Sequence, residues 1–203
     1  IPQFISNVSM DCYWNILCLQ EFGKQTTFEL LETANGLVYV FPGISKQSRS
    51  NAIAVSHQLA PHVGFHVFCS FGGLIAFNFG DVVLVVGTLH VPHSNHEVSL
   101  EQACCEMDIM FVDLLKHTTS VCKIPRNHVR YVVGADLNSE LHNPNKLSQR
   151  RTDMLAWFAE KDISPISPSD SLITSHNAWG NQHARLIDYL LVDSVTLPNC
   201  DDL

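Results

Sequence analysis

The stretch Val63–Leu89, VGFHVFCSFGGLIAFNFGDVVLVVGTL, decides the fold class. It contains three apolar runs that each have the length of a buried strand: Val63–Ser70, Gly73–Phe79 and Val82–Leu89. Gly72-Gly73 and Gly80-Asp81 separate the runs, and both pairs suit tight hairpin turns. Because no helix fits between Gly36 and Leu89, the stretch predicts adjacent antiparallel strands. It excludes a doubly wound parallel sheet, which needs a helix after nearly every strand.

Further strands and two amphipathic helices complete the prediction. The other strand candidates are Ile16–Leu19, Gly36–Phe41, Asn51–Ser56, Tyr131–Gly134 and Leu186–Val192. Apolar residues at spacings of three and four predict one helix from Ser99, where Gln102 completes a capping box, and a second over about 148–161. We therefore expect one α/β (α+β) domain over residues 1–203, a four-layer sandwich of two packed, mainly antiparallel sheets flanked by helices.

Composition excludes several classes of protein. Of the 203 residues, 46% are hydrophobic and 16% are charged, which excludes disorder. No stretch reaches the roughly 18 uncharged apolar residues of a membrane span, so we expect no membrane partner. Twelve Lys and Arg oppose 20 Asp and Glu, a formal charge of −8. A chain this acidic does not bind nucleic acid by charge alone, so any phosphate must be met by a few cations or by a metal.

The cysteines indicate a reducing compartment. Seven cysteines are an odd number, and their spacing contains no CxxC pair, which argues against a disulfide framework or a structural zinc site. A zinc site assembled from His57, His62, His66 and Cys69 would match no known spacing. We expect an intracellular protein, with the nucleus as one candidate compartment.

Polar clusters follow three of the predicted strands. Gln20-Glu21 follows Ile16–Leu19, His90 to Ser94 follow Val82–Leu89, and Asp136-Leu137-Asn138 follows the strand at Tyr131. Side chains at strand ends are held by a rigid sheet, as catalytic groups must be. Asp188 differs, because it lies within the apolar run Leu186–Val192, where a half-buried carboxylate needs a partner. Each feature alone also fits a solvated loop, an Asx turn or an ordinary surface residue.

The order of these clusters along the chain indicates a family. The segments are Leu17-Cys18-Leu19-Gln20-Glu21, Leu89-His90-Val91-Pro92-His93-Ser94, Val133-Gly134-Ala135-Asp136-Leu137-Asn138 and Arg185-Leu186-Ile187-Asp188-Tyr189-Leu190-Leu191-Val192. They resemble the LQE, H/Y-x-P, G-D-x-N and R-(I)-D-Y blocks of the endonuclease/exonuclease/phosphatase superfamily, the DNase I-like fold. Within it, the chain is most similar to the apurinic-type endonuclease domains of non-LTR (LINE-type) retrotransposons.

The resemblance implies a metal-dependent phosphodiester hydrolase. Glu21 would be the principal ligand of Mg²⁺, or alternatively Mn²⁺, and Asp136 would share the metal site. Asp136 would also orient and deprotonate the attacking water. Gln20 would hold the loop or a metal-bound water.

The same resemblance assigns the residues that meet the phosphate. His90 would contact the scissile phosphate, and His93 stands where the family often has an Asn against it. Asn138 would fix a phosphate oxygen or the nucleophile. Asp188 would be the buried partner that orients a catalytic histidine, and Arg185 would bind substrate.

Two blocks of the family are missing, so the sequence is expected to be truncated at both ends. The family's first strand ends in an Asn, and its last strand follows a Ser-Asp-His that neither Asp201-Asp202 nor another segment supplies. His176 or His183 could replace the missing histidine. The favoured interpretation is that both are ordinary residues of a polar loop.

Three functions remain open at this stage. The first is a Mg²⁺-dependent endonuclease that nicks DNA, with a reverse transcriptase domain in the same longer polypeptide. The second is a superfamily phosphoesterase acting on RNA, phospholipid or inositol phosphate. The third is an inactive remnant or interaction scaffold.

The cations available to contact a nucleic-acid backbone are Arg49, Arg126, Arg130, Arg150, Arg151 and Arg185, although solvation is the usual role of such residues. Arg150 and Arg151 fall in the first turn of a predicted helix, where cations oppose the helix dipole.

Overall fold

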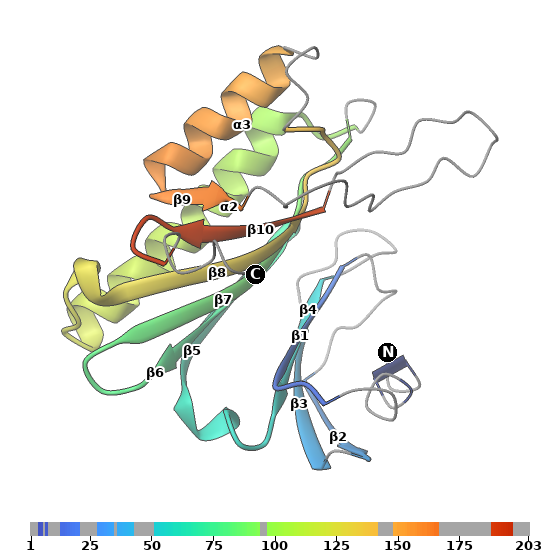
Figure 1. Ribbon diagram of the computed structural model, residues 1–203, viewed down its shortest axis with the longest axis vertical. Coiled ribbons are helices and arrows are strands. Elements are labelled where there is room, and N and C mark those ends of the chain that lie inside the picture. The colour runs from blue at the N-terminus through green and yellow to red at the C-terminus, as the bar shows by residue number, and fades with distance from the viewer. Residues whose placement is uncertain are drawn as a thin grey trace.

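A computed structural model describes residues 4, 5, 7, 13–20, 28–34, 36–42, 51–93, 97–141, 148–166 and 188–196. Its strands form two sheets that face each other (Figure 1). Sheet A has the order β1 (Ile16–Leu19), β4 (Ala52–Ser56), β3 (Gly36–Pro42), β2 (Glu29–Thr33) and is antiparallel throughout. Sheet B has the order β5 (Val63–Cys69), β6 (Gly72–Asn78), β7 (Val83–His90), β8 (Val129–Asp136), β10 (Asp188–Asp193), β9 (Ile163–Pro165).

Sheet B contains one parallel pair, β7 with β8, and its other pairs are antiparallel. The antiparallel pairs β5–β6 and β6–β7 are hairpins at the two glycine-containing turns, as the sequence predicted. The parallel pair requires a crossover, which the long helix α2 (Leu100–Lys116) provides. This crossover brings the carboxyl ends of β7 and β8 to the same edge of sheet B.

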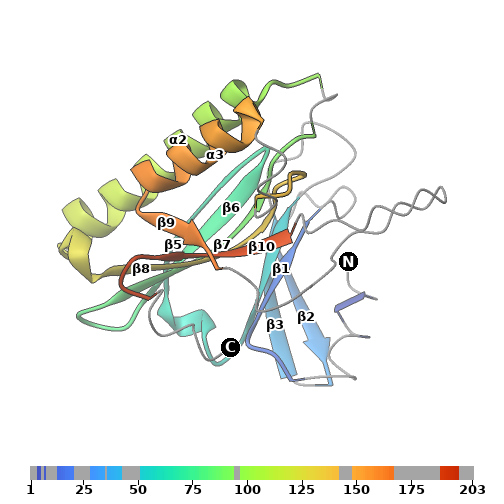
Figure 2. The same cartoon turned by 45° about the horizontal axis from the view of Figure 1, so that its top comes forward.

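Helices cover the outer face of sheet B. Figure 2 shows α2 and α3 (Gln149–Glu160) side by side above this sheet, with sheet A on its other side. Ser99 caps α2 through a capping box with Gln102, as predicted, and Ser148 caps α3. Short helical turns occur at η1 (Ala60–His62), η2 (His117–Val121, a π-helix) and η3 (Arg126–His128). Among the described helices, none is long and apolar enough to cross a bilayer.

Three apolar clusters join the layers. The largest lies between sheet B and its helices and includes Met107, Leu114 and Phe158. A second lies between the sheets, where Phe41, Ile53 and Val55 of sheet A meet Ile75, Phe77 and Val86 of sheet B. In the third, Ile5, which is helical and fully buried, packs on the outer face of sheet A. The expected sandwich of packed sheets and helices is therefore confirmed.

Two strands were not predicted. β2 has the sequence ELLET and alternates half-buried with exposed residues, as an edge strand does, so it lacks an apolar run. β9 has three residues, too few for a pattern to stand out. β8 is also longer than the predicted Tyr131–Gly134, because the strand continues through Ala135 to Asp136.

Candidate functional site at one edge of sheet B

Three of the predicted site residues lie in a row across sheet B. His90 is the register partner of Asp136 in the parallel pair, and Asp136 is the register partner of Asp188 in the antiparallel pair. Direct partners on neighbouring strands present their side chains on the same face of a sheet. That face is turned toward sheet A, because Val86, four residues before His90 on β7, packs in the cluster between the sheets. The sequence blocks for His90, Asp136 and Asp188 therefore meet at one edge.

The environment of Asp188 differs from the prediction. Asp188 is the first residue of β10 and its side chain is exposed, whereas the apolar run around it had suggested a half-buried position. Leu190, on the same face of β10, is 41% exposed, while Tyr189 and Leu191 on the other face are buried beneath the helices. The described residues of sheet A thus leave this part of β10 open. The carboxylates of Asp136 and Asp188 stand at adjacent positions, with Asp136 half-buried.

Asn138 organises the turn that follows β8. Its backbone N–H donates to Asp136 Oδ1 at 3.0 Å, which forms an Asx turn, and its φ of 48° lies in the left-handed region that Asn tolerates. The side-chain amide nitrogen lies 3.0 Å from the Val91 carbonyl oxygen and 3.3 Å from His90 Nε2. One amide hydrogen is therefore directed to each acceptor.

These contacts bear on the protonation of His90. An amide N–H can donate to Nε2 only when that nitrogen carries a lone pair, so this contact favours the His90 tautomer with its proton on Nδ1. The Val91 N–H in turn donates to the Asp136 backbone carbonyl at 2.8 Å. Both hydrogens of the Asn138 amide are directed to groups of the protein, one of them to His90. The resemblance had implied that this amide fixes a phosphate oxygen or the nucleophile.

Gln20 connects the two sheets beside this row. It follows β1 of sheet A, and its Nε2 donates to the carbonyls of Leu89 at 2.7 Å and Gly134 at 3.3 Å, on β7 and β8. The side chain therefore holds the loop end of β1 against the strand ends that carry His90 and Asp136. The resemblance had implied that Gln20 holds the loop or a metal-bound water. Glu21, the next residue in the sequence, lies outside the described residues.

Of the other predicted residues, the structure describes some and not others. His93 is exposed, three residues beyond His90 and outside β7. Arg185, His176 and His183 lie outside the described residues. Within the described ranges, no three His, Cys, Asp or Glu side chains converge as a metal site, which applies also to His57, His62, His66 and Cys69.

Sequence reasoning gave no role to Tyr189, although it lies in the last family block. The buried Tyr189 hydroxyl accepts a hydrogen bond of 2.7 Å from the Leu141 N–H. Leu141 closes the turn that begins at Asp136, so Tyr189 fastens that turn to β10. A tyrosine inside an apolar strand was the available signal, because a buried hydroxyl requires a partner.

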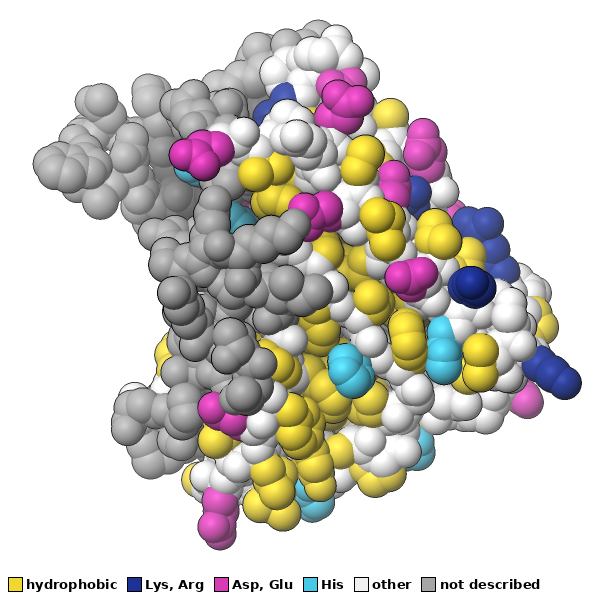
Figure 3. Space-filling view, turned by 180° about the vertical axis from the view of Figure 1, so that it is seen from behind, with side chains coloured by type: hydrophobic (Ala, Val, Ile, Leu, Met, Phe, Trp, Pro, Cys, Tyr) yellow, Lys and Arg dark blue, Asp and Glu magenta, His cyan; other side chains and the backbone are white. Residues whose placement is uncertain are grey.

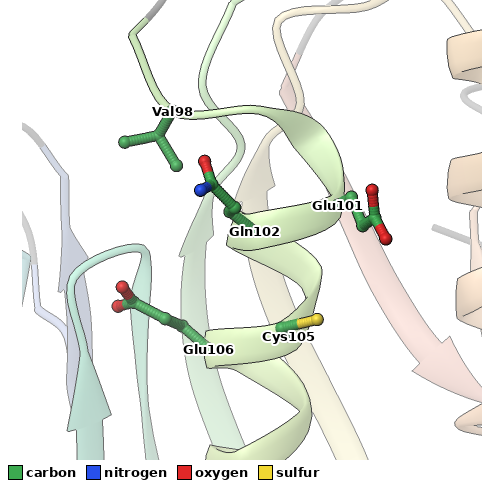
Figure 4. Close-up of a pocket in the computed structure, with 5 residues that line it drawn as sticks. All are labelled: Val98, Glu101, Gln102, Cys105 and Glu106. Carbon is green, nitrogen blue, oxygen red and sulfur yellow. The ribbon is translucent and has the colours of Figure 1, made fainter.

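Among the described residues, two open hollows lie elsewhere, and neither includes a predicted site residue of the row. One, of about 550 Å³, is lined by Val98, Glu101, Gln102, Cys105 and Glu106 of α2 and the segment before it. Figure 4 shows Glu101 and Glu106 on opposite sides of the helix, so their carboxylates do not converge on one ligand. The other, of about 440 Å³, includes Arg126, Arg130 and Lys161 at the opposite end of β8.

The described cations favour that opposite end. Figure 3 shows most of the visible dark blue Lys and Arg side chains at one side of the rear face, and one beside the region drawn in grey. Arg126 and Arg130, two of the arginines available to contact a nucleic-acid backbone, belong to this end because β8 begins at Val129 and reaches the site at Asp136. Arg150 and Arg151, in the first turn of α3, are placed differently.

The stacked sheets and the row at their edge define the class of fold: it is that of the endonuclease/exonuclease/phosphatase proteins. The chain matches a protein of that family from Leptotrichia buccalis C-1013-b with a TM-score of 0.53 and 12% identity, over 94% of this chain and 79% of that one. It matches the AP endonuclease LMAP from Leishmania major with a TM-score of 0.64 and 11% identity, over 96% and 74% of the two chains. The endonuclease domain of TRAS1, a telomere-specific non-LTR retrotransposon, matches with a TM-score of 0.54 and 10% identity, over 79% and 69%.

No protein-family model and no curated protein sequence matches the chain. At 10–12% identity, what these structures share with the chain is the fold. The fold implied by the four sequence blocks is therefore confirmed by structural comparison.

Proposed function

We propose that this chain is a phosphodiester hydrolase, and specifically an endonuclease domain that nicks DNA. The observation that carries the proposal is the row His90–Asp136–Asp188, with Asn138 and Gln20 fixing its strand ends. Solved structures of this fold that support it include an AP endonuclease and a retrotransposon endonuclease domain. In the proposed reaction, water attacks phosphorus and the bond to the 3′ oxygen breaks, which leaves a 3′-hydroxyl.

The row supplies a proton acceptor and phosphate contacts for this reaction, and the leaving 3′ oxygen would take its proton from solvent water. The half-buried Asp136 carboxylate would accept the proton of the attacking water, since an ionised carboxylate is an acceptor only. The contact from Asn138 favours a proton on His90 Nδ1, so a hydrogen bond to a phosphate oxygen would be donated from that atom. His93, which is exposed beyond the strand end, would extend this contact to the substrate backbone.

The donor set at the edge suits a hard divalent cation. Asp136 and Asp188 place carboxylates at neighbouring ladder positions, and two like charges side by side favour a cation between or beside them. With Glu21, which the resemblance adds as principal ligand, these residues would hold Mg²⁺ or Mn²⁺. The ion would neutralise charge on the phosphoryl oxygens.

A plasmid-nicking assay with and without Mg²⁺ tests the proposal directly. We expect Mg²⁺-dependent nicking by the wild type and a loss of roughly a hundredfold or more in Asp136→Ala, the size of effect seen when a positioned acid–base group is removed. Asp113→Asn is the matched control, because it changes an exposed carboxylate on α2. Equal rates for the wild type and Asp136→Ala would refute the proposal.

Assays on the same protein preparation test the other two functions. Faster turnover of RNA or of a soluble phosphodiester than of abasic or intact DNA would identify a phosphoesterase of another substrate class. No turnover of any substrate, together with no Mg²⁺ binding by calorimetry, would identify an inactive scaffold.

A further inference from the structure

Arg150 makes an unusual contact near the site. It lies in the first turn of α3, and its Nη2 donates a hydrogen bond to the backbone carbonyl of Pro92. Pro92 lies between His90 and His93, in the segment that leaves β7 at the site edge. The contact therefore joins the helical layer to the loop that carries both predicted phosphate-binding histidines.

The position of Arg150 is unfavourable for a cation in two respects. The first turn of a helix carries a partial positive charge, and this turn of α3 contains no acidic residue to offset it. The side chain is also half-buried, and desolvation by burial lowers the pKa of its guanidinium. Its Nε is buried and has no hydrogen-bond partner among the described residues. A salt bridge or a solvated surface position does not account for an arginine here, whereas the bond to Pro92 does.

The frame behind Arg150 is firmly held. On α3, the Trp157 Nε1–H donates to Asp108 of α2 at 2.8 Å, and Lys161 forms an ion pair with the same carboxylate. The two helices thus pack as one layer on sheet B. A guanidinium projecting from this layer can fix a loop carbonyl more firmly than a contact from another loop would.

The loop in turn is connected to the row. The Val91 N–H donates to the Asp136 carbonyl, and the Val91 carbonyl accepts from the Asn138 amide that also donates to His90 Nε2. Pro92 has no N–H of its own, so its carbonyl is the one backbone group through which it can be held by a hydrogen bond. Movement of Pro92 would be passed through Val91 and Asn138 to the imidazole of His90.

We propose that Arg150 is a positioning residue for the site: its bond to the Pro92 carbonyl holds the 90–93 segment so that Asn138 keeps His90 in one tautomer. The importance of this positioning for catalysis rests on the proposed function, but the positioning itself does not. In this role Arg150 acts through the loop, by its bond to the Pro92 carbonyl.

The test compares Arg150→Gln and Arg150→Lys with Arg151→Gln, which removes the neighbouring arginine of the same helical turn. Two readouts are independent of turnover: hydrogen exchange of the Val91 amide, relative to global stability in urea, and the ¹⁵N spectrum of the His90 imidazole. In Arg150→Gln we expect Val91 exchange to accelerate at least about tenfold beyond any change in global stability, a loss of about 1.4 kcal/mol of local protection. We also expect mixed His90 tautomers in that variant. Arg150→Lys should restore both signals in part, and Arg151→Gln should leave both as in the wild type.

If the wild type nicks DNA, Arg150→Gln should lower kcat by up to roughly a hundredfold with little change in KM, because a misplaced group costs rate more than binding. If the wild type does not nick DNA, the proposed function fails while the exchange and tautomer results still decide the role of Arg150. Equal Val91 exchange and an unchanged His90 tautomer in Arg150→Gln and Arg151→Gln would overturn the inference. Loss of global stability in Arg150→Gln without a further local effect at Val91 would also overturn it.

Discussion

Replacing Asn138 by alanine should destabilise the protein by about 3 kcal/mol, although the residue is only half-buried. Alanine removes two donated hydrogen bonds, to the Val91 carbonyl and to His90 Nε2, each contributing about 1 kcal/mol. It also places a residue with a Cβ and no compensating side-chain polarity at a φ of 48°. That backbone conformation costs roughly 1 kcal/mol for alanine.

Urea-induced unfolding, followed by tryptophan fluorescence, measures this loss. Ser139→Ala is the control, because Ser139 is the next residue in the same turn, is also half-buried, and should change stability by less than about 0.5 kcal/mol. In a His90→Ala background one of the two bonds is already absent, so Asn138→Ala should cost about 1 kcal/mol less there.

The reasoning would be refuted if Asn138→Ala and Ser139→Ala destabilised the protein equally. It would also be refuted in part if the cost of Asn138→Ala were the same with and without His90, because that result would show that the amide does not donate to the imidazole.

Four further substitutions test other parts of the fold. A Cβ added at Gly72 would lie 2.5 Å from the backbone oxygen of Thr88, so Gly72→Ala should cost about 1–3 kcal/mol. A Cβ added at Gly134 would meet no atom within 4 Å outside its chain neighbours. The free energy of unfolding of Gly134→Ala in urea should therefore stay within about 0.5 kcal/mol of the wild-type value. The Thr88 hydroxyl is buried without a hydrogen-bond partner among the described residues, so Thr88→Val should raise stability by about 1 kcal/mol, and a lowered Tm would contradict this. Burial would raise the pKa of the Asp193 carboxyl, but hydrogen bonds from the Tyr131, Val195 and Thr196 backbone and the Thr196 hydroxyl outweigh it and hold that pKa below its ordinary value. The resulting stabilisation is complete above the ordinary carboxyl pKa and is lost as pH falls through the lowered pKa of the folded state; Asp193→Asn should flatten the Tm profile in that acid range.

The strands were predictable where apolar runs end at turn residues. β5, β6 and β7 were predicted to within one residue at each end, because glycine-containing turns bound each run. β2 escaped prediction because an edge strand with one exposed face reads as polar sequence. Edge strands gain their structure from pairing, here with β3, and this pairing leaves little trace in local composition.

The strand ends that carry the candidate residues were predictable, but the way in which those residues lie relative to one another was not. Polar groups directly after apolar strands marked His90 and Asp136, and their order along the chain indicated the fold. The register that aligns them depends on the parallel pairing of β7 with β8, which joins strands about 40 residues apart in the chain and leaves no local pattern in the sequence. The exposure of Asp188 was predicted wrongly, because an apolar run shows that a strand is in a sheet but not which part of each face the opposite sheet covers.

The register of His90, Asp136 and Asp188 also has a consequence for how such sites diversify. Neighbouring strands lie about 4.8 Å apart whatever their side chains, so the hydrogen-bonded ladder fixes the spacing of the three backbone positions. A substitution in the row changes the chemical group presented without changing where the backbone presents it. If the row performs the proposed hydrolysis, a protein built on this edge could acquire a different base, ligand or phosphate contact one position at a time.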